Sequence, residues 1–224
     1  MAGTNTFTGA TTLGAGSLRG TATASFGAAG SGLTLNGGTL ELLTNAGTTF
    51  TNTNTTVGAG ATVSILADVF SGLSGISGFG NGYSNQQPMG TPGVTQVLGT
   101  LALGSGGLTV NSQNYNGAGV TFGASTISGT SASPSLLNVG GGASYSMVTL
   151  GAVTMGATAV LNVNPAGSGT LNLATATTGV TAGASINLSG GTLRLANATS
   201  VGTANSASGA LVTASGGVLE IANV

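Results

Sequence analysis

Charge is nearly absent from the chain. Two Lys or Arg and three Asp or Glu occur among 224 residues, and the formal net charge is −1. Soluble domains usually carry about 25% charged residues. With so few basic residues, the chain has no electrostatic footprint for nucleic acid or for an anionic membrane surface. We therefore expect no nucleic-acid partner.

Cysteine, histidine, tryptophan and long apolar runs are also missing. The absence of cysteine excludes a disulfide framework. No run of about 18 apolar residues occurs, so we expect no membrane insertion by this segment. The opening residues "MAGT" lack the basic and apolar regions of a signal peptide, so a secreted chain would be a mature form or an excised segment.

The chain instead contains short runs in which apolar and polar residues alternate. It contains 43 glycines, 40% hydrophobic residues and a mean hydropathy of +0.43, which separates it from disordered sequences. No apolar stripe of helical period continues for three turns, so helices are not expected. Alternating runs bounded by Gly, Asn or Ser predict strands of about three to six residues separated by tight turns. The runs cover residues 33–43, 61–66, 100–110, 159–163 and 170–174.

One pattern recurs along the chain. It reads "GTLEL" (38–42), "GTLNL" (169–173), "GTLRL" (191–195) and "GVLEI" (217–221), with a partial copy "GSLRG" (16–20). Successive central leucines are 22 residues apart (18 to 40, 171 to 193) or 26 apart (193 to 219), and the gap from 40 to 171 is one short of six steps of 22. A period near 22 is typical of one coil of a β-helix. We therefore predict an all-β, single-domain parallel β-solenoid over residues 1–224, with about ten coils.

Alternation within a coil assigns the faces. In "INLSGGTLRLA" we expect Ile186, Leu188, Leu193 and Leu195 to point inward and Arg194 to point outward. The glycines between the two apolar pairs would form the corner, where glycine adopts positive φ without strain.

Four of the five charged residues share one repeat position. Arg19, Glu41, Arg194 and Glu220 each follow the central leucine directly, and arginine precedes glutamate by one coil in both pairs. We predict a ladder of stacked ion pairs, each contributing about 0.2–1 kcal/mol because it is exposed. The simpler interpretation is that any charge must point outward. Because the pairs fall near the two ends, they would mark coils where register between subunits is fixed.

The N-terminal stretch "NTFTGATTLGAGSLRG" (5–20) resembles the autotransporter-associated β-strand repeat. The matching residues are Asn5, Thr6, Phe7, Thr8, Gly9, Thr11, Leu13, Gly16 and Leu18. Phe7 stands where tyrosine is commoner in that family. The resemblance implies a right-handed parallel β-helix in an extracellular or cell-surface protein of a bacterium.

Catalysis is not expected. β-Helical lyases and hydrolases need clustered carboxylates, often with calcium, or an acid/base pair. The carboxylates of this chain are Glu41, Asp68 and Glu220, and the two glutamates would lie about eight coils, roughly 40 Å, apart. No His or Cys can act as base, nucleophile or zinc ligand. We predict no catalytic, metal or cofactor site and no cofactor.

A loop excursion is predicted at residues 71–96. This stretch contains two prolines and no clear alternation, and Phe79 and Tyr83 are its large side chains. Long loops of repeat proteins often bind ligands, although a flexible insertion is equally compatible with the sequence. Asp68, just before it, would cap a turn or sit at a junction between subunits.

These observations favour an extracellular structural protein. We expect a self-assembling subunit of a surface fibre or layer, with the chain itself as partner in an end-to-end homopolymer. Neither end carries a polar cap: the chain opens with strand-like "NTFTG" and closes with "GVLEIANV". A longer passenger whose adjoining coils cover both ends is the competing account.

Two other functions remain open. An adhesin or autotransporter passenger stalk would display the 71–96 loop to a glycan or host surface. An ice-binding protein is a minor alternative suggested by Thr51, Thr53 and Thr55, although other Thr-x-Thr triplets do not share their register.

Overall fold

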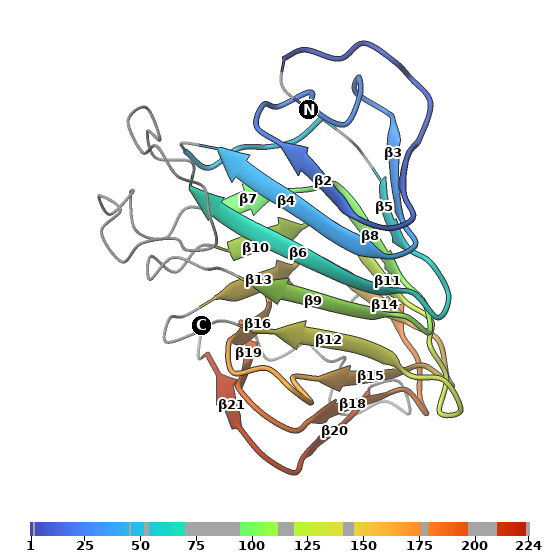
Figure 1. Cartoon of the computed structure of the whole chain (residues 1–224). Helices are drawn as coiled ribbons and strands as arrows, with labels where there is room; N and C mark the ends of the chain where they lie inside the picture. Colours follow the sequence, from blue (N-terminus) through green and yellow to red (C-terminus); the bar gives the residue numbers. More distant parts are fainter. Residues whose placement is uncertain are drawn as a thin grey trace.

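The computed structural model describes residues 1, 3–44, 46–51, 54–69, 95–111, 119–140, 146–175, 179–196 and 210–222, with the backbone alone for 68–69 and 179–180. Within these ranges the regular elements are twenty-one strands and no helix. The strands form three parallel sheets, and within each sheet they stack along one common axis, as Figure 1 shows.

The three sheets, here called A, B and C, are built from strands that follow one another along the chain in the order A, B, C. Sheet A contains β1 (Thr11–Leu13), β3 (Gly32–Leu35), β5 (Asn54–Val57), β8 (Thr100–Leu103), β11 (Ser125–Ile127), β14 (Val153–Met155) and β17 (Gly179–Val180). Sheet B contains β2 (Ser17–Gly20), β4 (Gly38–Thr44), β6 (Thr62–Val69), β9 (Gly107–Asn111), β12 (Ser135–Val139), β15 (Val160–Val163), β18 (Ser185–Leu188) and β20 (Leu211–Ala214). Sheet C contains β7 (Thr95–Val97), β10 (Gly119–Phe122), β13 (Met147–Leu150), β16 (Thr170–Leu173), β19 (Thr192–Leu195) and β21 (Val218–Ile221).

This arrangement is a β-solenoid, as the alternation and the repeats predicted. The described strands number seven, eight and six in the three sheets, so they form six to eight turns and the expected count of about ten is not confirmed. Some turns have the predicted 22 residues, but others are longer because their corners differ in length. One turn spans 22 residues, from Thr11 to Leu33, whereas another spans 29, from Gly107 to Leu136. Between β5 and β8 the step is 46 residues (54 to 100).

The repeated leucine pattern falls on two different sheets. Leu18 and Leu40 pair on sheet B, whereas Leu171, Leu193 and Leu219 form one column on sheet C. The expectation that all five share one repeat position is therefore wrong, and the 131-residue gap does not count whole coils. The reason is that a glycine corner followed by a strand occurs both where sheet A leads to sheet B and where sheet B leads to sheet C.

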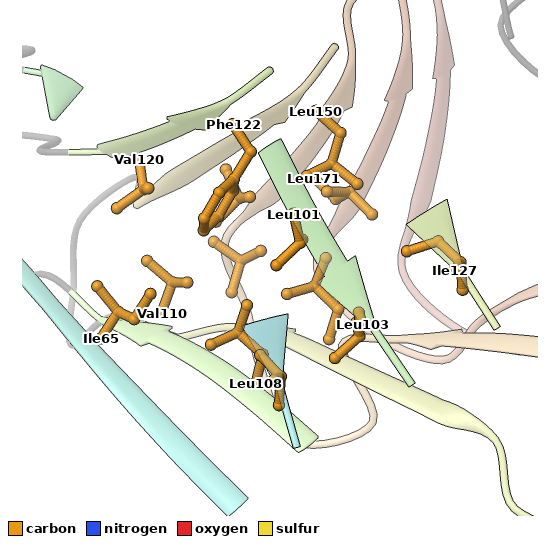
Figure 2. Packing of buried hydrophobic residues seen from close by; sticks show 14 of the residues in the cluster. Ile65, Leu101, Leu103, Leu108, Val110, Val120, Phe122, Ile127, Leu150 and Leu171 are labelled. Carbon is orange, nitrogen blue, oxygen red and sulfur yellow. The ribbon is translucent and has the colours of Figure 1, made fainter. Parts of the chain in front are cut away.

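The core is a column of mostly aliphatic side chains inside the three sheets. Leu40, Leu171 and Leu193 are fully buried, which confirms their predicted inward orientation. Figure 2 shows Phe122 and Leu101, from neighbouring sheets, among the side chains that fill this interior. At the N-terminal end the rings of Phe26 and Phe50 pack with centroids 5.2 Å apart, so a non-strand segment completes the core there.

The corners depend on residues with positive φ. At Gly38, where φ is +79°, a Cβ atom would lie 2.5 Å from the carbonyl oxygen of Gly16 in the neighbouring turn. Asn164 adopts φ 53° and is buried. Its Oδ1 accepts from Val139 N at 2.6 Å and its Nδ2 donates to Gly169 O at 3.1 Å. The asparagine therefore holds one corner to the turn before it.

Candidate functional site

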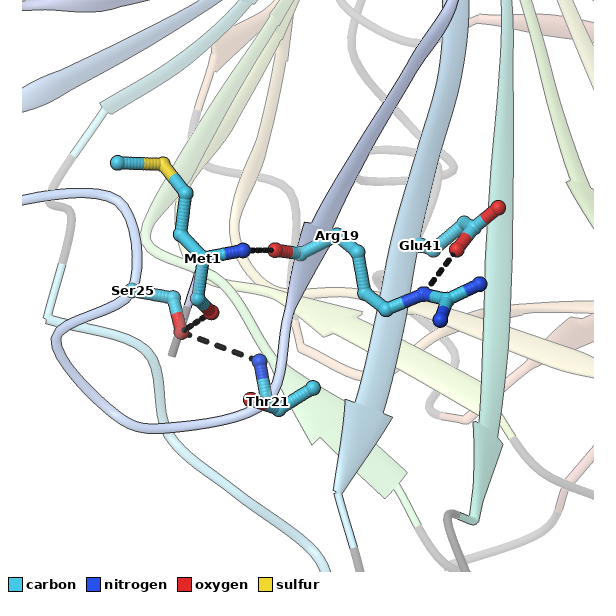
Figure 3. Close-up of polar contacts among 5 residues, drawn as sticks. All are labelled: Met1, Arg19, Thr21, Ser25 and Glu41. Atoms are coloured by element: carbon cyan, nitrogen blue, oxygen red, sulfur yellow. Dashed lines mark hydrogen bonds and ion pairs between the residues drawn. The ribbon is translucent and has the colours of Figure 1, made fainter. Parts of the chain in front are cut away.

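The first ion pair lies near the N-terminal end, on the outer face of sheet B. Arg19 on β2 and Glu41 on β4 are direct strand partners, and their Nε and Oε2 atoms are 2.5 Å apart. The Arg19 side chain is 51% exposed and that of Glu41 16%. Figure 3 shows the arginine side chain reaching across to the glutamate, while Met1 N donates to Arg19 O. This pair links the first two turns on the outer face of sheet B.

The second ion pair lies near the other end, on sheet C. Arg194 on β19 and Glu220 on β21 are also direct partners, with 3.4 Å between Nε and Oε1. Both side chains are nearly half exposed. The structure thus brings each arginine beside the glutamate of the following turn. The two pairs lie on different sheets, so the four charges do not share one repeat position.

The remaining predicted contact residues are not brought to a site. Asp68 lies in β6, where its backbone pairs with Leu43, and its side chain is outside the described residues. Phe79 and Tyr83, with the 71–94 part of the predicted loop, also lie outside them. The ligand-binding loop therefore stays a prediction.

The described part of the chain contains neither a metal-binding cluster nor two neighbouring carboxylates. No group of three or more His, Cys, Asp or Glu residues there could hold a metal ion. The described carboxylate side chains, Glu41 and Glu220, each lie in an ion pair with arginine at opposite ends of the stack. Among the described residues no helix is long and apolar enough to cross a membrane.

The two ends of the stack differ in how they are covered. At the N-terminal end residues 3–10 form no strand, contrary to expectation, and lie along residues 24–28. There Ala28 N donates to Phe7 O at 2.9 Å, and Asn5 Nδ2 donates to Ser25 O at 2.8 Å. This segment covers the first turn on the side where sheet C lies in the later turns.

The last described turn, in contrast, exposes apolar side chains. Leu219 and Ile221 are 39% and 64% exposed, although their partners Leu193 and Leu195 in the turn before are buried. On β20, Leu211 is also exposed. No described strand pairs with the outer edge of β20 or β21. The strand pattern of "GVLEI" predicts a core position for Leu219 and Ile221, but it contains no information on whether a further strand lies beside them.

The outer face of sheet A carries a column of threonines that the sequence pattern did not predict. Directly paired outward positions on successive strands carry Thr12, Thr34, Thr56, Ala102, Thr126 and Thr154. Unequal turn lengths hide this column in the sequence, because the spacing between its members varies from 22 to 46 residues.

No family model, curated protein or solved structure matches this chain. The resemblance of residues 5–20 to the autotransporter-associated repeat therefore stays a prediction. The candidate functional surface is consequently defined by geometry alone: the uncovered apolar end at β20 and β21, with Glu220 at its rim.

Proposed function

We propose that this chain is a non-enzymatic structural subunit that assembles end to end into an extracellular fibre or surface layer. One observation carries the proposal: the last described turn leaves apolar side chains exposed on β20 and β21. Unpaired strand edges also present backbone N–H and C=O groups that pair readily with another strand. The second copy of the chain is thus the partner that restores both the core and the sheet ladders.

The surface composition supports the same proposal. Proteins that stay monomeric usually carry many surface charges of both signs, and edge strands are commonly protected by lysine or proline. This chain has five charged residues, and four of them are already paired within the chain. Little electrostatic repulsion therefore opposes contact between copies.

Right-handed winding and a bacterial surface location belong to the proposal as well. Connections between parallel strands of one sheet are right-handed in nearly all proteins. The stretch 5–20, with its resemblance to the autotransporter-associated repeat, supports placement at a bacterial cell surface.

Electron microscopy and sedimentation of the purified chain test the proposal. We expect filaments or large polymers that grow with protein concentration. The variant Ile221→Lys places a charge on the exposed apolar end and should abolish assembly without unfolding the monomer. The control Thr126→Lys adds the same charge to the middle of sheet A, where it should leave end-to-end assembly intact. Discrete monomers of the unmodified chain at all concentrations would refute the proposal.

Ice binding is a second candidate function, favoured by the threonine column of sheet A. Regularly spaced outward hydroxyl and methyl groups about 4.8 Å apart present a repeating surface to water. Thr12, Thr56, Thr126 and Thr154 are exposed members of the column. Thermal hysteresis of the chain in freezing solution tests this function, and Thr126→Lys should reduce it. Ice crystals that grow unshaped and without hysteresis would exclude it.

A further inference from the structure

The two ends of the stack carry corners of the same form. At one end β20 and β21 are joined so that the inward residues Ala214 and Leu219 are five positions apart. At the other end β1 and β2 are joined so that the inward residues Leu13 and Leu18 are also five positions apart. The residue before the second strand is in each case a glycine with positive φ, namely Gly217 at +77° and Gly16 at +74°.

The matching corners lie on different sides of the solenoid. The β20–β21 corner connects sheets B and C, whereas the β1–β2 corner connects sheets A and B. One corner can therefore stack on the other only if the second copy is rotated about the axis of the stack. The rotation places each sheet of the second copy on the next sheet of the first. Such a turn brings β2 of the second copy onto β21 of the first, and β1 onto β20.

Charges at the two edges are complementary in this arrangement. Within one chain, Arg194 is followed by Glu220, and Arg19 is followed by Glu41, each one turn apart. Stacking the glycine of one corner on that of the other places Glu220 of the first copy beside Arg19 of the second. Two isolated pairs then become one row of four charges with alternating sign. The apolar Leu219 would meet the half-buried Leu18 of the second copy beside this row.

Backbone polarity agrees with this register. Val218 N donates to Gly191 O, and Thr39 N donates to Gly16 O, both at 2.8 Å. Because successive residues of a strand direct their N–H and C=O groups to opposite neighbours, Gly217 O faces away from β19. By the same alternation, Ser17 N faces away from β4. The donor of one copy therefore meets the acceptor of the other.

The N-terminal contact described above competes with part of this pairing. Met1 N donates to Arg19 O, which is the oxygen that would accept from Ile221 N of the first copy. Docking exchanges one donor for another at Arg19 O, so this oxygen stays paired. It also requires Met1, whose carbonyl oxygen accepts from Ser25 Oγ at 3.0 Å, to leave the edge of β2.

We infer that copies of this chain dock head to tail with a rotation of about a third of a turn per subunit, set by the shift from one sheet to the next. The inference rests on the proposed assembly and specifies its interface: β20–β21 of one copy against β1–β2 of the next. Stacking without rotation would place β2 of the second copy on β20. It would bring Thr213 beside Arg19 and leave Glu220 without an intermolecular partner.

Disulfide trapping distinguishes the two registers, because the chain has no cysteine of its own. Adjacent strands place paired Cα atoms about 4.8 Å apart, which suits a disulfide. We would mix Glu220→Cys with Arg19→Cys chains in equal amounts, oxidise them mildly and separate the products without reductant. The matched control mixes Thr213→Cys with Arg19→Cys. We expect a disulfide-linked dimer as the main product of the first mixture and only a trace in the control.

Filaments of the unmodified chain supply a second measurement, since the cysteine variants remove the charges in question. Helical reconstruction should give a rotation of about a third of a turn between successive subunits. A cross-link in the control mixture only, or a filament without that rotation, overturns the inference while the proposed assembly stands. Filaments that cross-link in neither mixture also overturn it. The absence of any polymer removes both the inference and the proposed function.

Discussion

The leucine column of sheet C allows one chemical change to be compared in two environments. Leu193 is fully buried between Leu171 and Leu219, whereas Leu219 is 39% exposed at the last described turn. Leu193→Ala removes buried methyl and methylene groups and leaves a cavity inside a stack that is covered on both sides. We expect a loss of about 2–5 kcal/mol in the free energy of unfolding.

Leu219→Ala is the matched control at the equivalent position one turn later. Its side chain gains less from burial, and its removal encloses no cavity, so we expect a loss of at most about 1–2 kcal/mol for the monomer. Urea denaturation followed by circular dichroism, at a protein concentration below assembly, measures both losses. The melting temperature of a chain of this size should fall by about 2–4 °C per kcal/mol.

Equal losses for the two variants would refute the reasoning. They would mean that Leu219 is as well covered as Leu193, and hence that the apolar end is closed in the isolated chain. Under assembling conditions the difference should narrow, because docking would bury Leu219. Persistence of the full difference in polymers would count against the docked interface.

Three further predictions concern corners and charges. Gly38→Ala should destabilise the fold by about 1–3 kcal/mol, because alanine is strained at φ +79° and its Cβ would meet Gly16 O; Gly156→Ala, with open space around it, should cost under about 0.5 kcal/mol in the same thermal melts. Asn164→Ala should cost about 2–4 kcal/mol through two lost hydrogen bonds and an unfavourable φ, and Asn164→Gly should recover the φ part only, as judged by urea midpoints. Raising NaCl to about 1 M should change the monomer's unfolding free energy by less than about 1 kcal/mol, because the ion pairs are exposed; a larger loss would show that they contribute more than surface pairs do.

The sequence predicted local features better than it predicted the sheet to which each repeat belongs. The inward leucines follow from alternation, which depends only on neighbouring residues. The neighbours Arg19 and Glu41, one turn apart, follow from a short and regular turn. The relation between the two ends could not be derived, because it requires the length of every intervening corner. A glycine corner of the same sequence serves two different sides of the solenoid, so counting periods of 22 gave the wrong sheet for Leu171.

The candidate surface was predictable only in part. Strand character at residues 217–221 was evident from the pattern, and so was the inward position of Leu219. Whether Leu219 is exposed depends on whether another strand packs beyond β21. The sequence of a single repeat contains no information about such a strand. The corner at Asn164 was also missed, since glycine is the usual residue at positive φ and asparagine adopts it much less often.

The long step between β5 and β8 has a consequence for how such a chain tolerates change. Asn54 pairs with Thr100 and Thr62 pairs with Gly107, so the strands of neighbouring turns keep their register across a step of 46 or 45 residues. The length of chain between turns is thus independent of the spacing of the turns themselves. We therefore expect a change in the length of chain between β6 and β7 to leave the register of the stack unchanged. This position is therefore the natural place to graft a foreign peptide, because its ends are fixed by two sheets that do not depend on what joins them.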